Sequence, residues 1–78
     1  MSEPTISSGL SELLGRHRLS QTALAQASRL QPGTISALYH GRTDSISMVT
    51  LARLLCGLRA LTGQPYTAAD LLRYHPES

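Results

Sequence analysis

Apolar residues recur along this chain at the three- and four-residue steps that are typical of α-helices. Near the start, four of them share one helical face: Ile6, Leu10, Leu13 and Leu14. Either Thr5 or Ser7 is expected to cap this helix, after a loose start over residues 1–5. Three basic residues follow at positions 16–18, where the helix dipole favours cations. The pattern therefore predicts a first helix that ends near residue 18.

The middle of the chain carries the start and stop signals of two more short helices. Ser20 is a strong N-cap, and Leu19 before it is placed to pack against Leu24. After a break at residues 28–30, Pro32 suits the first position of a helix, because its missing N–H is not needed there. Gly41 is typical of a helix end. These signals predict two helices within residues 20–40, separated by a tight turn.

The strongest periodic segment lies between Ser47, a favourable N-cap, and Gly63, a favourable helix stop. Six apolar residues between them follow helical spacing: Met48, Leu51, Leu54, Leu55, Leu58 and Leu61. Cys56 lies beside this stripe and is expected to be a small core residue. The segment predicts a long fourth helix.

The last part of the chain predicts one more short helix. Thr67 is expected to cap it, and it runs through Leu72. Tyr74 is then expected to pack back on the core, and residues 75–78 to fray. With 78 residues, the chain is expected to form a single all-α domain of five helices, residues 1–78.

The composition agrees with this fold and limits the function. Phe and Trp are absent, and the apolar content is mainly Leu and Ala, which favour helices. Seven basic residues, all arginine, against five acidic ones give a net charge of +2, which is compatible with a nucleic-acid partner. The one cysteine, Cys56, allows no internal disulfide and no cysteine-based metal site. No signal peptide and no membrane-spanning apolar run is apparent, so a cytoplasmic location is expected.

The helix pair within residues 20–40 has a clear inward and outward side. Four residues are predicted to point inward: Ala25, Leu30, Ile35 and Leu38. Six are predicted to point outward: Gln31, Pro32, Gly33, Ser36, Ala37 and His40. A second helix held in this way can enter the major groove of DNA while the first crosses the backbone.

This segment resembles the helix-turn-helix of the phage repressor and Cro-like (XRE-type) DNA-binding family. The residues that carry the resemblance are Leu19, Ser20, Gln21, Leu24, Ala25, Thr34, Ile35, Ser36, Leu38 and Gly41. Further matches follow in the fourth helix, at residues 47–54, and in the closing helix, at residues 69–72. The resemblance covers about residues 6–74 and implies a compact five-helix, repressor-like DNA-binding domain.

The resemblance also implies a role for each residue of the site. Gln21 is expected to bond a phosphate, helped by the backbone N–H groups at the start of its helix. Base edges are expected to meet Gln31, Pro32, Gly33, Ser36 and Ala37, with Thr34 or Ala37 touching a thymine methyl. His40, Arg42 and Thr43 are expected to touch the DNA backbone beyond the helix. Because no Arg or Asn is available for bidentate base readout, DNA shape is expected to contribute much of the specificity.

Three positions depart from the family pattern. Arg29 stands where the family turn usually begins with Gly, so either Arg29 adopts that strained conformation or the turn differs slightly. Leu14 and Tyr39 occupy positions that form an ion pair in some members, and here they are expected to pack together with the core. The fourth helix is expected to run about one turn longer than usual.

The resulting interpretation is a transcription regulator, most simply a repressor, that binds double-stranded DNA as a homodimer through the helix at residues 32–40. The apolar face of the fourth helix and residues 66–74 are its candidate dimer surfaces. The alternative is an antitoxin-like or adaptor module whose main partner is another protein, such as a toxin. An enzyme is not expected, because no nucleophile elbow, phosphate loop or carboxylate pair is present. The histidines lie on separate segments, so no metal or other cofactor is expected.

Overall fold

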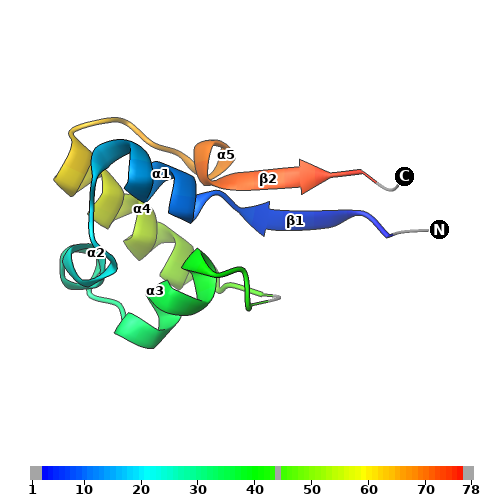
Figure 1. Ribbon diagram of the computed structural model, residues 1–78, viewed down its shortest axis with the longest axis horizontal. Coiled ribbons are helices and arrows are strands. Elements are labelled where there is room, and N and C mark those ends of the chain that lie inside the picture. The colour runs from blue at the N-terminus through cyan, green and yellow to red at the C-terminus, as the bar shows by residue number, and fades with distance from the viewer. Residues whose placement is uncertain (1–2, 44, 77–78) are drawn as a thin grey trace.

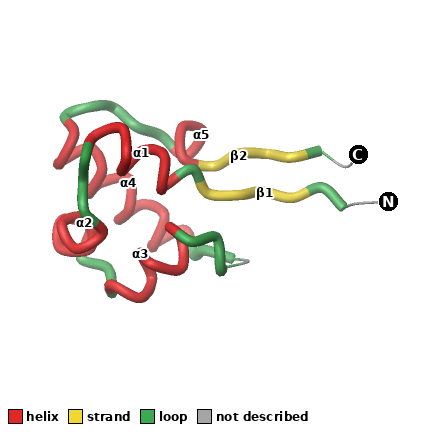
Figure 2. Tube along the Cα trace, in the orientation of Figure 1, coloured by secondary structure: helices red, strands yellow, loops and turns green. Residues whose placement is uncertain are grey.

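Five helices and one pair of strands form the part of the chain that the computed structural model describes, residues 3–43 and 45–76 (Figure 1). In chain order they are β1 (Thr5–Ser8), α1 (Leu10–His17), α2 (Gln21–Ser28), α3 (Pro32–Tyr39), α4 (Met48–Thr62), α5 (Ala68–Leu71) and β2 (Leu72–His75). The helices gather at one end, and the strands project from them as a ribbon that holds both ends of the described chain (Figures 1 and 2). The predicted five helices are therefore present, and the all-α assignment is only approximate.

The ribbon corrects the predictions for both ends of the chain. β1 and β2 pair antiparallel, with Ile6 opposite Tyr74. Neither Thr5 nor Ser7 caps a helix: α1 begins at Leu10, whose backbone N–H donates to the Ser8 hydroxyl over 3.1 Å. Residues 5–8 are extended because their backbone groups find partners in β2 rather than in a helical turn.

Two further predictions at these ends were wrong. Tyr74 does not pack on the core but is 67% exposed, because its strand lies beyond the helices. His75 does not fray: it ends β2, and its imidazole hydrogen-bonds the Ser7 hydroxyl across the ribbon, with 2.7 Å between Nε2 and Oγ. The predicted fraying of residues 77 and 78 lies outside the described residues.

The core lies between the helices and is built almost entirely of leucine. Its buried apolar residues are Leu10, Leu13, Leu14, Leu24, Ala25, Ile35, Leu38, Leu54, Leu58 and Leu71. The predicted stripe of α4 is only partly correct, because Met48 at its start is 83% exposed. Cys56 was predicted in the core and is exposed instead, since it lies on the face of α4 opposite Leu54 and Leu58.

A close approach between α2 and α4 fixes the position of the helix pair. Gly57 of α4 is buried against Ser28, the last residue of α2. A Cβ on Gly57 would lie 2.9 Å from both the Cβ and the backbone N of Ser28. The buried Ser28 hydroxyl donates to the Leu24 carbonyl oxygen over 2.6 Å, so its polar group is satisfied inside this contact. The absence of a side chain at residue 57 therefore sets the spacing of the two helices.

The predicted caps are confirmed at three helices. Ser20 accepts a hydrogen bond from the backbone N–H of Ala23 over 3.0 Å, and Ser47 accepts one from Thr50 over 3.1 Å. Gly63 ends α4 in the left-handed conformation, at φ 69°. Thr67 is the N-cap of α5, and the Asp70 carboxylate accepts hydrogen bonds from the Thr67 backbone N–H over 2.8 Å and from its hydroxyl over 3.0 Å.

Candidate nucleic-acid interface

The turn between α2 and α3 begins with an arginine in the left-handed conformation. Arg29 occupies the left-handed region, at φ 58° and ψ 36°, where Gly is normally favoured. The chain then reverses, and the backbone N–H of Leu30 donates to the Ala25 carbonyl oxygen over 3.1 Å. Leu30 packs against the core, as predicted. Of the two alternatives for this turn, the structure has the first: Arg29 adopts the strained conformation.

α3 is fastened to the rest of the molecule along one side. Pro32 is its first residue, as predicted, and Gln31 before it makes no side-chain cap. Ile35 is fully buried and Leu38 is 5% exposed, so both inward predictions are confirmed. Tyr39 is partly buried against the core, which also contains Leu14. These two residues pack in place of the ion pair, as the departure from the family pattern predicted.

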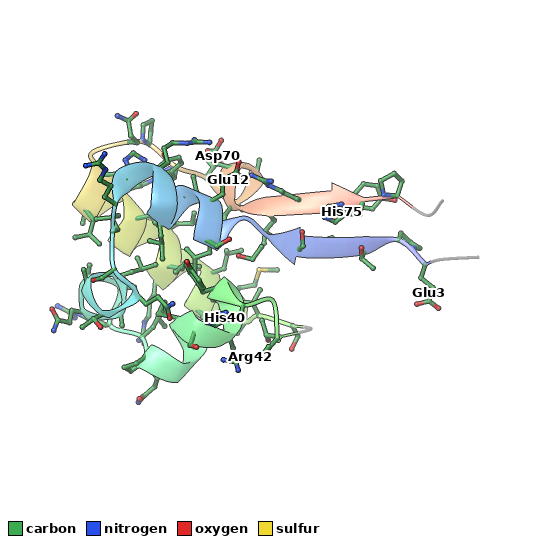
Figure 3. The ribbon with its side chains drawn as sticks, viewed as in Figure 1. Glu3, Glu12, His40, Arg42, Asp70 and His75 are labelled. Carbon is green, nitrogen blue, oxygen red and sulfur yellow. The ribbon has the colours of Figure 1, made fainter. Side chains whose placement is uncertain are left out.

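The opposite side of α3 is exposed at both ends and half-buried between them. Gln31, Pro32, Gly33 and His40 are exposed, and Thr34, Ser36 and Ala37 are half-buried. His40 and Arg42 follow one another at the end of α3, on the side of the molecule away from α1 and the ribbon (Figure 3). The His40 ring packs edge-on against Tyr39, with 5.0 Å between ring centroids, and this contact holds its orientation. Gln21 is half-buried at the first position of α2.

Arg42 returns over α3 and contacts another residue of the predicted site. Gly41, at φ 69°, reverses the chain after α3, and the backbone N–H of Arg42 donates to the Ala37 carbonyl oxygen over 2.8 Å. The Arg42 guanidinium then donates to the Ser36 hydroxyl, with 3.0 Å between Nη2 and Oγ. The residue predicted to touch phosphate thus lies directly beside one predicted to meet a base edge.

A surface groove of about 400 Å³ runs between α3 and the start of α4. Four residues of the predicted site line it: Gly33, Thr34, Ala37 and Thr43. The other side of the groove is lined by Ser45, Ser47 and Thr50, which the sequence interpretation did not include in the site. The sequence marked Ser47 as a helix cap and placed both Ser47 and Thr50 in the segment that resembles the family's fourth helix, but assigned neither to the site. They bond each other through their hydroxyls over 2.9 Å.

The acidic groups of the described residues lie away from this surface. Glu12 and Asp70 lie on the opposite side of the molecule from Arg42, and Glu3 lies at the far end of the ribbon (Figure 3). The Glu12 carboxylate forms an ion pair with Arg73, and the Asp70 carboxylate accepts a hydrogen bond from the backbone N–H of Thr67.

Neither metal ligands nor a membrane segment is found in the described parts of the chain. Over residues 3–43 and 45–76, no three His, Cys, Asp or Glu side chains lie close enough together to hold a metal ion. Within the same residues, none of the helices has the length and apolar character needed to cross a membrane.

A comparison with protein families gives one match that covers most of the chain. The model of the Cro/C1-type HTH DNA-binding domain matches residues 9–77. The matched residues run from the start of α1 past the end of β2. No curated protein and no solved structure matches the chain.

Proposed function

The chain belongs to the Cro/C1-type helix-turn-helix DNA-binding family and is accordingly a DNA-binding transcription regulator; we propose that it is a sequence-specific repressor that inserts α3 into the major groove. The observation that carries this proposal is the two-sided character of α3. Ile35 and Leu38 anchor one side in the core, while Gln31, Pro32 and Gly33 are exposed at its N-terminal end. A rigid helix with a free polar end is what major-groove recognition requires.

The residues of this surface divide into two kinds of contact. Gln31, Pro32, Gly33, Ser36 and Ala37 meet base edges, with Thr34 or Ala37 against a thymine methyl. Gln21, His40, Arg42 and Thr43 meet the sugar–phosphate backbone and set the position of the domain on the duplex. Gln31 is the one long amide among the base-facing residues, so it carries most of the hydrogen-bonded readout. DNA shape supplies the remaining specificity.

Regulation follows from occupancy of a promoter. A homodimer with two-fold symmetry places one α3 in each half of a palindromic operator, and bound protein excludes polymerase. Repression is the simpler mode, because it requires only that the bound protein occupy the promoter, whereas activation requires a further contact with polymerase. Binding of this kind needs no cofactor and no catalysis, and it takes place in the compartment that contains the DNA.

The test is selection of bound duplexes from a random DNA pool at near-physiological salt. The proposal predicts enrichment of a palindromic motif with two equal half-sites. Repeating the selection with Gln31→Ala should lose the preference at one position in each half-site, at a cost of roughly 1–3 kcal/mol per bidentate contact. Gln64→Ala is the matched control, since Gln64 is also exposed but follows α4, away from α3.

The opposite result has a clear meaning. If no sequence is enriched, and weak binding disappears steeply as salt rises, only non-specific phosphate contact remains. The alternative function, an antitoxin-like or adaptor module with a protein as main partner, then takes precedence. A stoichiometric partner that co-purifies from the native cell would support that alternative.

A further inference from the structure

Two arginines have a backbone conformation that does not suit an arginine. Arg18 ends α1 at φ 54° and ψ 42°, and Arg29 ends α2 at φ 58° and ψ 36°. Among the described residues, these are the two non-glycine residues with a positive φ. The left-handed conformation brings the Cβ too close to the following carbonyl oxygen, and glycine would avoid this cost. Residues strained in this way concentrate at functional sites.

Both arginines belong to the same short arrangement of residues. Each is followed by a leucine that packs against the core, Leu19 or Leu30. The next residue is the N-cap of the following helix, Ser20 before α2 and Gln31 before α3. The chain therefore turns the leucine inward and leaves the arginine outside, close to the N-terminal end of the next helix. These two helix ends are the ones that carry the predicted DNA contacts.

Neither guanidinium has a role in holding the described chain together. Both arginines are exposed. Arg42, Arg59 and Arg73 each form a hydrogen bond or an ion pair within the chain. Arg18 and Arg29 form neither with any residue that the structure describes. A cation gains some energy at the end of a helix, but this gain is smaller than the cost of the left-handed conformation. Folding alone therefore does not account for arginine at these positions.

Positive charge is concentrated in the same part of the chain. Residues 13–40, which include the end of α1, α2 and α3, contain three arginines and no acidic residue. The five acidic residues of the chain lie outside this range, at positions 3, 12, 44, 70 and 77. A segment with charge of one sign attracts a polyanion.

The ends of α3 are suited to contact with phosphates on both sides of a groove. The eight residues of α3 span about 12 Å at 1.5 Å each, which is about the width of the major groove. Arg29 lies just before α3 and Arg42 just after it. Figure 1 shows the α2–α3 turn at the opposite end of α3 from the loop that follows it. Arg18 has the same relation to the start of α2, where Gln21 has its proposed phosphate contact.

We propose that Arg18 and Arg29 bind DNA phosphates, in addition to the backbone contacts of the proposed function. A guanidinium binds a phosphate through two parallel N–H donors. Arg29 contacts the backbone on one side of the major groove and Arg42 contacts it on the other, while Arg18 contacts the strand that α2 crosses. The family turn usually begins with Gly at the position of Arg29, so the family resemblance does not imply this contact. The inference rests on the proposed placement of α3 in the major groove.

This role accounts for the strain. Arginine at either position makes the free domain less stable than glycine would, and it gains charge-assisted hydrogen bonds in the complex with DNA. Replacement by glycine should therefore raise stability and weaken DNA binding. A purely structural role would move both quantities in the same direction.

The experiment is fluorescence anisotropy with a labelled duplex of mixed sequence, over salt concentrations of about 50–200 mM. Arg18→Gln and Arg29→Gln keep a long polar side chain and the same backbone strain but remove the charge. Each should reduce the slope of log affinity against log salt by about 0.9 and weaken binding by roughly fivefold to tenfold near 0.1 M salt. Arg18→Lys and Arg29→Lys keep the charge and should keep the slope of the wild type.

The matched control is Arg16→Gln. Arg16 is also an exposed arginine, but it lies one helical turn after Glu12, on the same face of α1. Glu12 lies on the opposite side of the molecule from Arg42 (Figure 3). The Arg16 variant should therefore leave the slope unchanged.

The glycine variants exclude loss of folding as the cause of weaker binding. Arg18→Gly and Arg29→Gly should each raise the urea midpoint and still reduce the slope by about 0.9. A Gln or Gly variant whose slope equals that of the wild type overturns the assignment of that residue. A slope reduced equally by Arg16→Gln overturns the distinction between these arginines and an ordinary surface charge.

Selection of bound duplexes separates this inference from the proposed function. Both Gln variants should enrich the same motif as the wild type, because phosphate contacts carry no sequence information. If the slopes change as expected but the wild type enriches no motif, the arginine contacts stand and sequence-specific repression is refuted. If a palindromic motif is enriched and neither variant changes the slope on that motif, the proposed function stands and the arginine contacts are refuted.

Discussion

Gly57→Ala tests whether the close approach of α2 and α4 determines the stability of the domain. The new Cβ would lie 2.9 Å from the Cβ and backbone N of Ser28 and 3.0 Å from its Cα. Ordinary contact begins near 3.5 Å, so one helix has to move. Ser28 cannot turn aside by changing rotamer, because two of the three contacts are with its backbone and its hydroxyl is held by Leu24.

The magnitude follows from two opposing terms. Overpacking a filled core costs about 1–3 kcal/mol, and contact with backbone atoms places this site near the upper end. Alanine is favoured over glycine in a helix by about 1 kcal/mol, which works in the other direction. We expect the free energy of unfolding to fall by about 2 kcal/mol. In a domain of this size that lowers Tm by roughly 8–16 °C.

Urea and thermal unfolding followed by circular dichroism provide the assay, and Gly15→Ala is the matched control. Gly15 also lies within a helix, α1, but a Cβ there would meet no atom within 4 Å. Its substitution should therefore raise stability by roughly 0.5–1 kcal/mol. If Gly57→Ala stabilises the domain as Gly15→Ala does, the close approach is not a constraint and the packing argument is refuted.

Three other substitutions test the turn, a cap and the site. Arg29→Gly should stabilise the domain by up to about 1 kcal/mol. It removes a left-handed strain of about 1–2 kcal/mol from the folded state, but glycine also increases the conformational entropy of the unfolded chain, which offsets part of this gain. A lower urea midpoint would contradict this prediction. Ser47→Ala should lower the free energy of unfolding by about 1 kcal/mol, since Ser47 caps α4, and an unchanged urea midpoint would show that the cap contributes nothing. Arg42→Ala should weaken binding to all duplexes equally and reduce the slope of log affinity against log salt by about 0.9, as measured by fluorescence anisotropy; a changed sequence preference would instead give Arg42 a role in base readout.

The helices could be predicted from the sequence because their signals are local. Ser20, Pro32 and Ser47 each act on backbone groups within one turn of their own position, and Gly63 needs only its own conformation. The inward and outward sides of α3 follow from the spacing of Ile35 and Leu38 in the same way. Where a short stretch of sequence contains both the signal and its structural consequence, prediction succeeded.

The ribbon and the Gly57 contact could not be predicted, because each depends on residues far apart in the chain. Ile6 fits the helical spacing of Leu10 and Leu13, and only the pairing of β1 with β2 removes it from that helix. Gly57 interrupts the apolar stripe of α4 and gives no signal until Ser28 is seen against it. A glycine within a helix lowers helix propensity, so its stabilising role becomes visible only when the neighbouring helix that packs closely against it is known.

The sequence also did not show a contact within the site, because the roles of two residues were predicted separately and the structure places a hydrogen bond between them. Ser36 was assigned to base edges and Arg42 to phosphate, yet the guanidinium donates to the hydroxyl over 3.0 Å. A serine hydroxyl that accepts from Arg42 still has its own proton to donate, so near α3 it favours an acceptor on a base edge. Because the contact is exposed, breaking it on binding costs little. We propose that Arg42 leaves Ser36 for a phosphate on binding, so that the two proposed roles stay separate, and the contact itself depends on the reversal of the chain at Gly41.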